Sequence, residues 1–462
     1  MKKLILFCCV CTTFAPSYLK TNAQSMQENI QAPKAKEIPK TLKKHKETRI
    51  DNYFWLNDRE NPEVIDYLNK ENEYYQQMTS HTKGFQESLY EEMKGRIKED
   101  DSSVPYFYNG HYYITRFETG KDYPIFSRKK GSLSAEEEIL FNCNELAVGH
   151  AYFKLGGLSI SPDNKFASFG TDIVGRRIYT IQIKNLETGE ILSDKIENAT
   201  GGSVWANDNK TIFYTKQDEV TLRADKIFRH KLNTDSKNDV LVYDEIDDTF
   251  NVSISKEKSR KYIVIGSSST LTTEYRILNS DNPDGEFEVF QPRVRGLEYS
   301  ISHYEDSFYI LTNKDKATNF KLMKTPENKT GKKNWVDVIP HREDVLLEDI
   351  EIFKNFLVVE ERSNGLNHIR IMPWNDEPDY YLPFGSETYN AFTTTNIDFD
   401  TDILRYSYQS LATPSSVIDF NMKTKTKEIL KEQQVLGGKF DKENYVEERD
   451  WATASDGVKL PI

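Results

Sequence analysis

The chain has 462 residues, a formal net charge of −12 at pH 7 and 12% aromatic residues. This acidic balance argues against nucleic acid or an anionic membrane as a partner, because like charges repel. The length exceeds what one compact core usually holds, and the abundance of Tyr and Phe favours β-strands.

The amino terminus predicts a signal peptide over residues 1–23. A basic start at Met1–Lys3 precedes an apolar run, Leu4–Ala15, that is too short to span a bilayer, and Thr21–Ala23 offers small residues at a cleavage site. Cleavage there would leave Cys143 as the last of the 4 cysteines, so we expect no internal disulfide. We therefore expect an exported protein, periplasmic or secreted, with no membrane span.

Two amphipathic helices are expected between residues 51 and 100, after a polar, lysine-rich linker at residues 24–50. Asn61 is typical of a helix cap, and Pro62 of a first helical position. The second helix carries an apolar stripe with one residue every four positions, at Phe85, Leu89, Met93 and Ile97. Each helix has an apolar face that some surface must cover, and self-association is one way to cover it.

The stretch Gly157–Leu192 predicts four short strands joined by tight turns. The turn Ser161–Asn164 contains Pro, Asp and Asn, and Leu186–Glu190 is typical of a hairpin connection. One antiparallel sheet of this size is marginal alone, so it needs neighbours of the same kind.

This pattern recurs about seven times at a period of roughly 40 to 50 residues, the spacing of propeller blades. We therefore predict an all-β fold, a seven-bladed β-propeller, over residues 101–432. The alternative is an open sandwich of many strands, but the regular spacing of the strand pairs favours the propeller. The copies run over Val104–Phe141, Gly157–Leu192, Gly202–Val242, Phe250–Phe290, Tyr299–Ile339, Asp349–Phe384 and Thr395–Leu430.

No catalytic, cofactor-binding or metal-binding residue can be assigned from the sequence. The nucleophile motif G-x-S-x-G is absent, and its nearest match, Gly157–Ser161, fails at the last position. No two of the 8 histidines lie within ten residues, His230 reads as structural, and Cys143 is a lone thiol. The acidic runs Glu136–Glu138 and Asp244–Asp248 are typical of solvated loops, with steering of basic peptides as the alternative.

Several segments together resemble the prolyl oligopeptidase family of serine peptidases and, within it, oligopeptidase B (protease II). Asn52 and Phe54 depart from the family's usual Pro and Arg in the first of them. The matching segments are Asp51–Asp58, Gly120–Pro124, Trp205–Asp208, Ser410–Pro414, Tyr445–Arg449 and Trp451–Lys459.

The resemblance implies a propeller that covers an α/β-hydrolase active site and admits only short peptides, which the family cleaves after Arg or Lys. The helices of residues 51–100 would then pack on the hydrolase domain, and residues 433–462 would begin its second part. The Ser, His and Asp of the triad would lie beyond Ile462, so we assign no residue of this chain to the triad. We therefore expect the chain to be inactive alone. Two alternatives remain: a secreted propeller that acts as a binding module, and an unrelated propeller of the TolB-like type.

Overall fold

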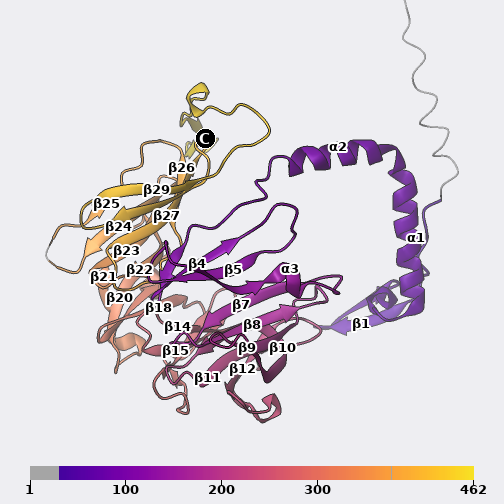
Figure 1. Cartoon of the computed structure of the whole chain (residues 1–462), viewed down its shortest axis with the longest axis horizontal. Helices are drawn as coiled ribbons and strands as arrows, with labels where there is room; N and C mark the ends of the chain where they lie inside the picture. Colours follow the sequence, from indigo (N-terminus) through magenta and orange to yellow (C-terminus); the bar gives the residue numbers. More distant parts are fainter. Residues whose placement is uncertain (1–30, 376) are drawn as a thin grey trace, which may run out of the picture. The chain divides into compact units, whose positions relative to one another are not determined.

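The computed structural model describes residues 31–375 and 377–462 and divides the chain into two compact units, Met1–Ile97 and Lys98–Ile462 (Figure 1). The signal peptide expected at residues 1–23 lies outside the described residues. The two units are described separately below.

The first unit begins with a β-hairpin where the composition had predicted only a linker. Strands β1 (Lys40–Lys44) and β2 (Glu47–Asp51) pair antiparallel from Lys40 opposite Asp51 to Lys44 opposite Glu47. His45 and Lys46 form the turn, both with positive φ, at 52° and 68°. In β2, Thr48 and Ile50 alternate with charged residues, whereas β1 has Thr41 and Leu42 side by side among lysines, so the charged composition concealed the hairpin.

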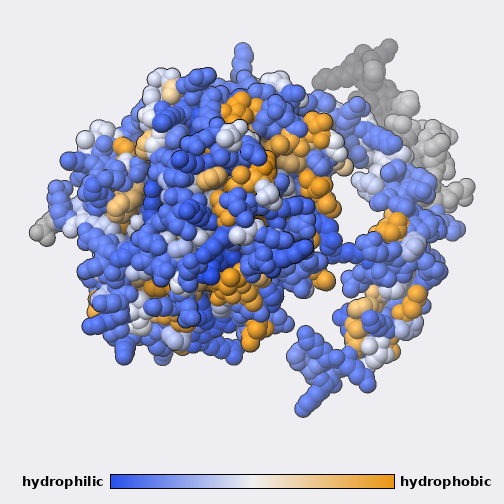
Figure 2. Space-filling view, turned by 60° about the horizontal axis from the view of Figure 1, so that its bottom comes forward, coloured by the Kyte–Doolittle hydropathy of each residue, from blue (hydrophilic) through white to orange (hydrophobic). Residues whose placement is uncertain are grey.

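The two expected helices are present in the first unit. After the 3₁₀ turn η1 (Phe54–Asn57), helix α1 (Pro62–Met78) begins at the Asn61 cap, whose side chain accepts a hydrogen bond of 3.0 Å from the Glu63 amide. The 3₁₀ turn η2 (Ser80–Thr82) leads into α2 (Lys83–Lys94). None of the side chains of α2 is buried, and hydrophobic residues reach the surface among hydrophilic ones (Figure 2).

The second unit is an all-β propeller of antiparallel sheets, as predicted, with strands in chain order. Five of its sheets have four strands. They are β3 (Tyr106–Tyr108), β4 (His111–Arg116), β5 (Ile125–Lys130) and β6 (Glu137–Asn142); β14 (Asn251–Lys256), β15 (Tyr262–Ser268), β16 (Thr273–Asn279) and β17 (Glu288–Val289); β18 (Tyr299–Tyr304), β19 (Ser307–Thr312), β20 (Lys321–Pro326) and β21 (Val336–Ile339); β22 (Leu346–Ile352), β23 (Phe356–Ser363), β24 (Leu366–Pro373) and β25 (Tyr380–Tyr381); and β26 (Tyr389–Thr393), β27 (Ile403–Ser410), β28 (Ser416–Asn421) and β29 (Thr426–Glu432).

The remaining large sheet has seven strands, because two of the expected repeats are fused. Its strands are β7 (Lys154–Ile160), β8 (Phe166–Asp172), β9 (Tyr179–Asn185), β10 (Ile191–Trp205), β11 (Thr211–Gln217), β12 (Ala224–Lys231) and β13 (Val240–Asp244). The first half of β10 pairs with β9 and the second half pairs with β11, so one strand of 15 residues serves both repeats.

Glycines permit this fusion where β10 passes close to β7. A Cβ on Gly157, whose φ is +63°, would lie 2.1 Å from the Gly201 carbonyl oxygen. A Cβ on Gly201, whose φ is +97°, would lie 2.8 Å from the ring of Tyr179. Only glycine fits both positions without strain.

The hydrophobic core lies between neighbouring sheets. One cluster joins Phe353 and Val358 of the β22–β25 sheet to Leu404 and Phe420 of the β26–β29 sheet. Similar clusters join the other neighbours, so each sheet is stable only beside the next.

The first and last sheets meet through side chains, and no strand crosses between them. The Arg405 guanidinium donates to the Pro105 carbonyl at 2.7 Å, and Lys431 donates to Asp101 and to the Ser102 carbonyl, both at 2.6 Å. A cavity of 280 Å³ lies along this seam. The remaining elements are helix α3 (Cys143–Leu146), the 3₁₀ turns η3 (Ser236–Asn238), η4 (Lys314–Lys316), η5 (Lys332–Asn334) and η6 (Lys442–Asn444), and a hairpin of β30 (Trp451–Thr453) and β31 (Lys459–Pro461).

Candidate functional site

The turns that follow the first strand of each sheet gather on one face of the propeller. Asn109 donates to the Pro162 carbonyl at 2.7 Å, so the first turns of two neighbouring sheets are linked. On the other side of the ring, Tyr304 donates to the Lys354 carbonyl at 2.9 Å, and Lys354 pairs with Asp400 at 2.8 Å. These contacts connect the turns that follow the first strands of the sheets, and we refer to this set of turns as the belt.

Two contacts in this belt join sheets that are not neighbours in the ring. Lys258, after β14, pairs with Glu351 of β22 at 2.7 Å, although the β18–β21 sheet lies between them in sequence. Arg260 donates to the Asn109 side chain at 3.4 Å, which joins the β14–β17 sheet to the first sheet. Contacts of this kind cross the ring, so these side chains lie close to its axis.

An acidic cluster of three residues, Asp349, Glu351 and Glu360, surrounds the Lys258 contact. Burial raises the pKa of all three carboxyl groups, and their mutual repulsion raises the pKa of Glu351 and Glu360 further. Burial also lowers the pKa of Lys258, whose ammonium lies 3.8 Å from the centre of the Phe353 ring. Enclosed groups with perturbed pKa values are typical of functional sites and of structural ion-pair networks alike.

Two more titratable groups belong to the same region. Burial raises the pKa of Glu257 to about 7, and this carboxyl accepts a hydrogen bond of 2.9 Å from the His303 amide. Burial lowers the pKa of Lys256 to about 8, and its ammonium donates to the Trp205 carbonyl at 3.0 Å. The axis therefore carries carboxyl groups together with the ammonium groups of Lys256 and Lys258.

The structure brings one serine, one histidine and one glutamate together in a way that the sequence did not reveal. The ring of His303 lies 2.9 Å from Ser259 Oγ through Nδ1 and 3.1 Å from Glu327 through Nε2. Glu327 also accepts from Lys261 at 2.5 Å and from Tyr262 at 3.1 Å. No sequence motif could have predicted this, because the three side chains come from two different sheets.

This arrangement holds the sheets together and does not have the environment of an acyl-transfer site. The His303 ring is 3% exposed and lies against the rings of Tyr262 and Phe308, each 5.0 Å away. Burial lowers the pKa of His303, and the Glu327 carboxylate is already neutralised by Lys261. A base in a triad needs access to substrate, which this buried ring does not have.

The other candidates singled out in the sequence have structural roles in the described residues. Ser159 lies within β7, where its carbonyl accepts from the Trp205 indole at 3.1 Å. Cys143 is buried, and burial raises the pKa of its thiol to about 11, so it stays protonated. His230 is fully buried between Asp194 and Asp239.

Among residues 31–375 and 377–462, no group of three or more His, Cys, Asp or Glu side chains is placed to hold a metal ion. No helix in this part of the chain has the length and apolar character needed to cross a membrane.

Comparison with known proteins places this geometry in context. Residues 33–433 match the family described as prolyl oligopeptidase, N-terminal beta-propeller domain. Dipeptidyl aminopeptidase BI of Pseudoxanthomonas mexicana is 39% identical over 436 residues, which cover 90% of this chain and 60% of that protein. Protease 2 of Moraxella lacunata is 33% identical over 437 residues, which cover 93% of this chain and 62% of that protein.

The solved structures agree with the sequence comparisons. Oligopeptidase B from Leishmania major superimposes with a TM-score of 0.85 at 30% identity, and the match covers 94% of this chain and 64% of that one. Oligopeptidase B from Trypanosoma brucei gives the same TM-score, 0.85, at 28% identity. The chain therefore spans less than two thirds of the length of these relatives.

Proposed function

Since the chain belongs to the prolyl oligopeptidase family, through its amino-terminal propeller domain, we propose that it is the propeller portion of an oligopeptidase B-like serine peptidase. The match to the family's propeller over residues 33–433 carries this proposal. The propeller admits short peptides to a hydrolase domain and excludes longer chains by size. The helices of the first unit pack on that hydrolase domain, which supplies the triad.

The ring has seven blades in this proposal. Five are the four-stranded sheets, and the seven-stranded sheet supplies the other two, because β10 ends one blade and begins the next. Each blade then has four strands, which is the usual composition of a propeller blade.

Short basic peptides are the proposed substrates. Lys258 pairs with Glu351, so Asp349 and Glu360 leave more carboxyl groups than cations in this cluster, and where these carboxyl groups are ionised the local potential is negative. A peptide with Arg or Lys is attracted there, while an acidic peptide is repelled.

A chimera tests the size filter and the substrate class together. We would join this chain to the carboxy-terminal remainder of Protease 2 from Moraxella lacunata and assay it on a short Arg-containing peptide and on an unfolded protein. The chimera should cleave the short peptide and leave the long chain intact. Equal cleavage of both substrates would rule out a filter.

The relative with dipeptidyl aminopeptidase activity in its name supports a second candidate function, release of dipeptides from the amino terminus. Product analysis by mass spectrometry on the same chimera separates the two. Fragments ending in Arg or Lys support the oligopeptidase, and successive dipeptides support the aminopeptidase.

A propeller that only binds peptides is the alternative from a different class. The coding sequence immediately downstream of Ile462 distinguishes the two. A continuation that encodes G-x-S-x-G supports the peptidase, and a stop codon followed by unrelated sequence supports the binding module.

Export is also part of the proposal, on the basis of the basic start and the apolar run that follows it. The mature protein, isolated from the envelope or the medium, should begin near Gln24 in a mass measurement. A retained Met1 in the mature protein would contradict export.

A further inference from the structure

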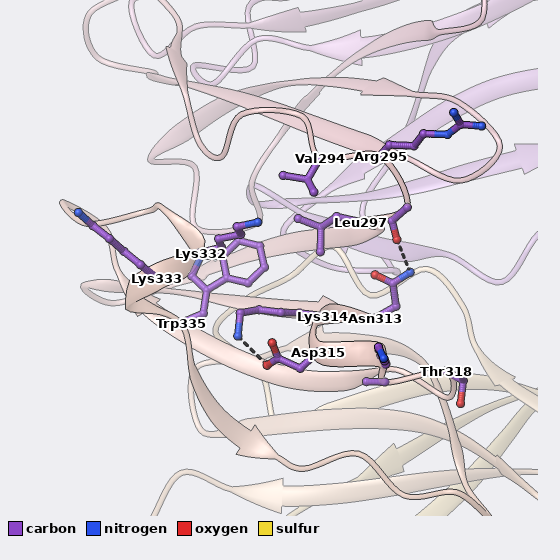
Figure 3. A pocket seen from close by; sticks show the side chains of 13 residues that line it. Val294, Arg295, Leu297, Asn313, Lys314, Asp315, Thr318, Lys332, Lys333 and Trp335 are labelled. Atoms are coloured by element: carbon purple, nitrogen blue, oxygen red, sulfur yellow. Dashed lines mark hydrogen bonds and ion pairs between the residues drawn. The ribbon is translucent and has the colours of Figure 1, made fainter.

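A cavity of 570 Å³ lies on the propeller, and none of the residues of the acidic cluster lines it. The loop before β18, the loop after β19 and the loop before β21 enclose it (Figure 3). Its inner wall is apolar, because Leu297 and Trp335 are 7% and 5% exposed and Val294 lies beside them. A volume of this size is typical of sites for small molecules.

Basic side chains dominate the lining, in a chain whose net charge is −12. The single acidic residue, Asp315, is already neutralised by Lys314 at 2.7 Å and by Lys321 at 3.1 Å. The five basic residues of the lining are Arg295, Lys314, Lys316, Lys332 and Lys333.

Four of these five cations have no charged partner among the described residues. Lys332 and Trp335 lie side by side at the inner wall, while Arg295 and Lys333 extend outward at the rim (Figure 3). The φ angles of Asp315 and Lys316 are 60° and 64°, a left-handed conformation that is unfavourable for residues other than glycine. The basic groups of the lining that lack a charged partner favour an anion by charge attraction.

We propose that this cavity binds a small ligand that carries two or more anionic groups, either carboxylates or phosphates. The apolar wall of Leu297 and Trp335 accommodates the body of the ligand, and Lys314, Lys316 and Lys332 neutralise its charges. Lys316, Lys332 and Lys333 are the lysines of the lining without a charged partner among the described residues, whereas Lys314 is shared with Asp315. An ammonium group can pair with a carboxylate or a phosphate, because it acts as a point charge without a fixed fork geometry. This inference does not depend on the proposed peptidase function, because the cavity lies outside the acidic cluster.

Calorimetric titration of the purified chain with citrate and, separately, with pyrophosphate tests this site. The test variant carries Lys316→Gln, Lys332→Gln and Lys333→Gln. The control carries Lys121→Gln, Lys210→Gln and Lys237→Gln, which removes the same charge from exposed positions elsewhere. The first set should raise the Kd at least about fivefold, and the control less than about twofold.

Each outcome decides the proposal. Charge-dependent binding of citrate alone identifies carboxylates as the ligand groups. Charge-dependent binding of pyrophosphate alone identifies phosphates. Either result supports the site. Absence of binding for both, or equal weakening by the two variants, overturns it. If the triple variant unfolds, the single Lys332→Gln change is measured against Lys210→Gln with the same criterion.

Discussion

His230 is held as a charged ring in the folded protein, because both of its nitrogens face carboxylates. Nδ1 lies 2.7 Å from Asp239 and Nε2 lies 2.9 Å from Asp194, and two such bonds require both N–H groups. Burial alone would lower the pKa of His230, but the hydrogen bonds to Asp239 and Asp194 outweigh burial and raise it above 6.5. The sequence indicated a structural histidine, and it could not identify partners 36 and 9 residues away.

The stability supplied by His230 should depend on pH. A raised pKa in the folded state means that this stability is fully present below about pH 6.5 and is lost as the pH rises through the folded value. His230→Gln should therefore lower the free energy of unfolding by about 3 kcal/mol near pH 6, since it leaves buried carboxylates without their partner. The loss should shrink at higher pH.

Urea unfolding of both proteins across this pH range checks the expectation. His150→Gln, at an exposed histidine, is the matched control and should change little at any pH. A His230→Gln effect that stays constant with pH would show that the ring is neutral in the folded protein.

The contact between Lys258 and Glu351 should be energetically coupled across the ring. Their side chains are 16% and 26% exposed, so removal of one leaves the other poorly solvated. Lys258→Met and Glu351→Gln should each destabilise the protein by about 1 to 2 kcal/mol, and the double variant by less than the sum. A double-mutant cycle in urea measures this, and strictly additive effects would place the two side chains apart.

At the scale of elements, the sequence predicted the helices and most strands but missed three features. The Asn61 cap and the four strands from Leu158 to Leu192 were recognised because their signals are local. The β1–β2 hairpin was missed because its strands are rich in charged residues, and the fusion through β10 depends on a contact between distant glycines. The sequence pattern predicted that the last repeat starts at Thr395, whereas its first strand, β26, starts at Tyr389.

Helix α2 should drive self-association of this chain through its apolar stripe. Phe85, Leu89 and Met93 are 69%, 39% and 52% exposed, and exposed apolar patches favour association. The sequence had placed Ile97 on the same stripe, but the helix ends at Lys94, before this residue. Phe85→Ser with Met93→Ser should shift the sedimentation of the protein toward the monomer at micromolar concentrations. Serine substitutions at Gln86 and Glu92 are the control and should leave the sedimentation unchanged. A wild-type chain that is monomeric at every concentration would contradict this role of α2.

At the scale of the whole molecule, the repeated strand pattern made the propeller predictable from the sequence. The candidate site was not predictable, because its residues are far apart in the chain. Seven similar stretches were visible in the sequence because each repeat uses the same turns. The acidic cluster at the axis was not visible, because Lys258 and Glu351 are 93 residues apart and meet only when the ring closes. The basic cavity was likewise hidden, since three separate loops supply its basic residues.

We propose that this chain supplies the ring of a peptidase and no nucleophile of its own. The most direct test incubates the purified chain with a short Arg-containing amide substrate, with and without a covalent inhibitor directed at serine, and then measures the mass of the protein. We predict no turnover that the inhibitor abolishes and no inhibitor adduct. Inhibitor-sensitive turnover would contradict the claim, and an adduct on Ser259 would place the nucleophile beside His303 and Glu327.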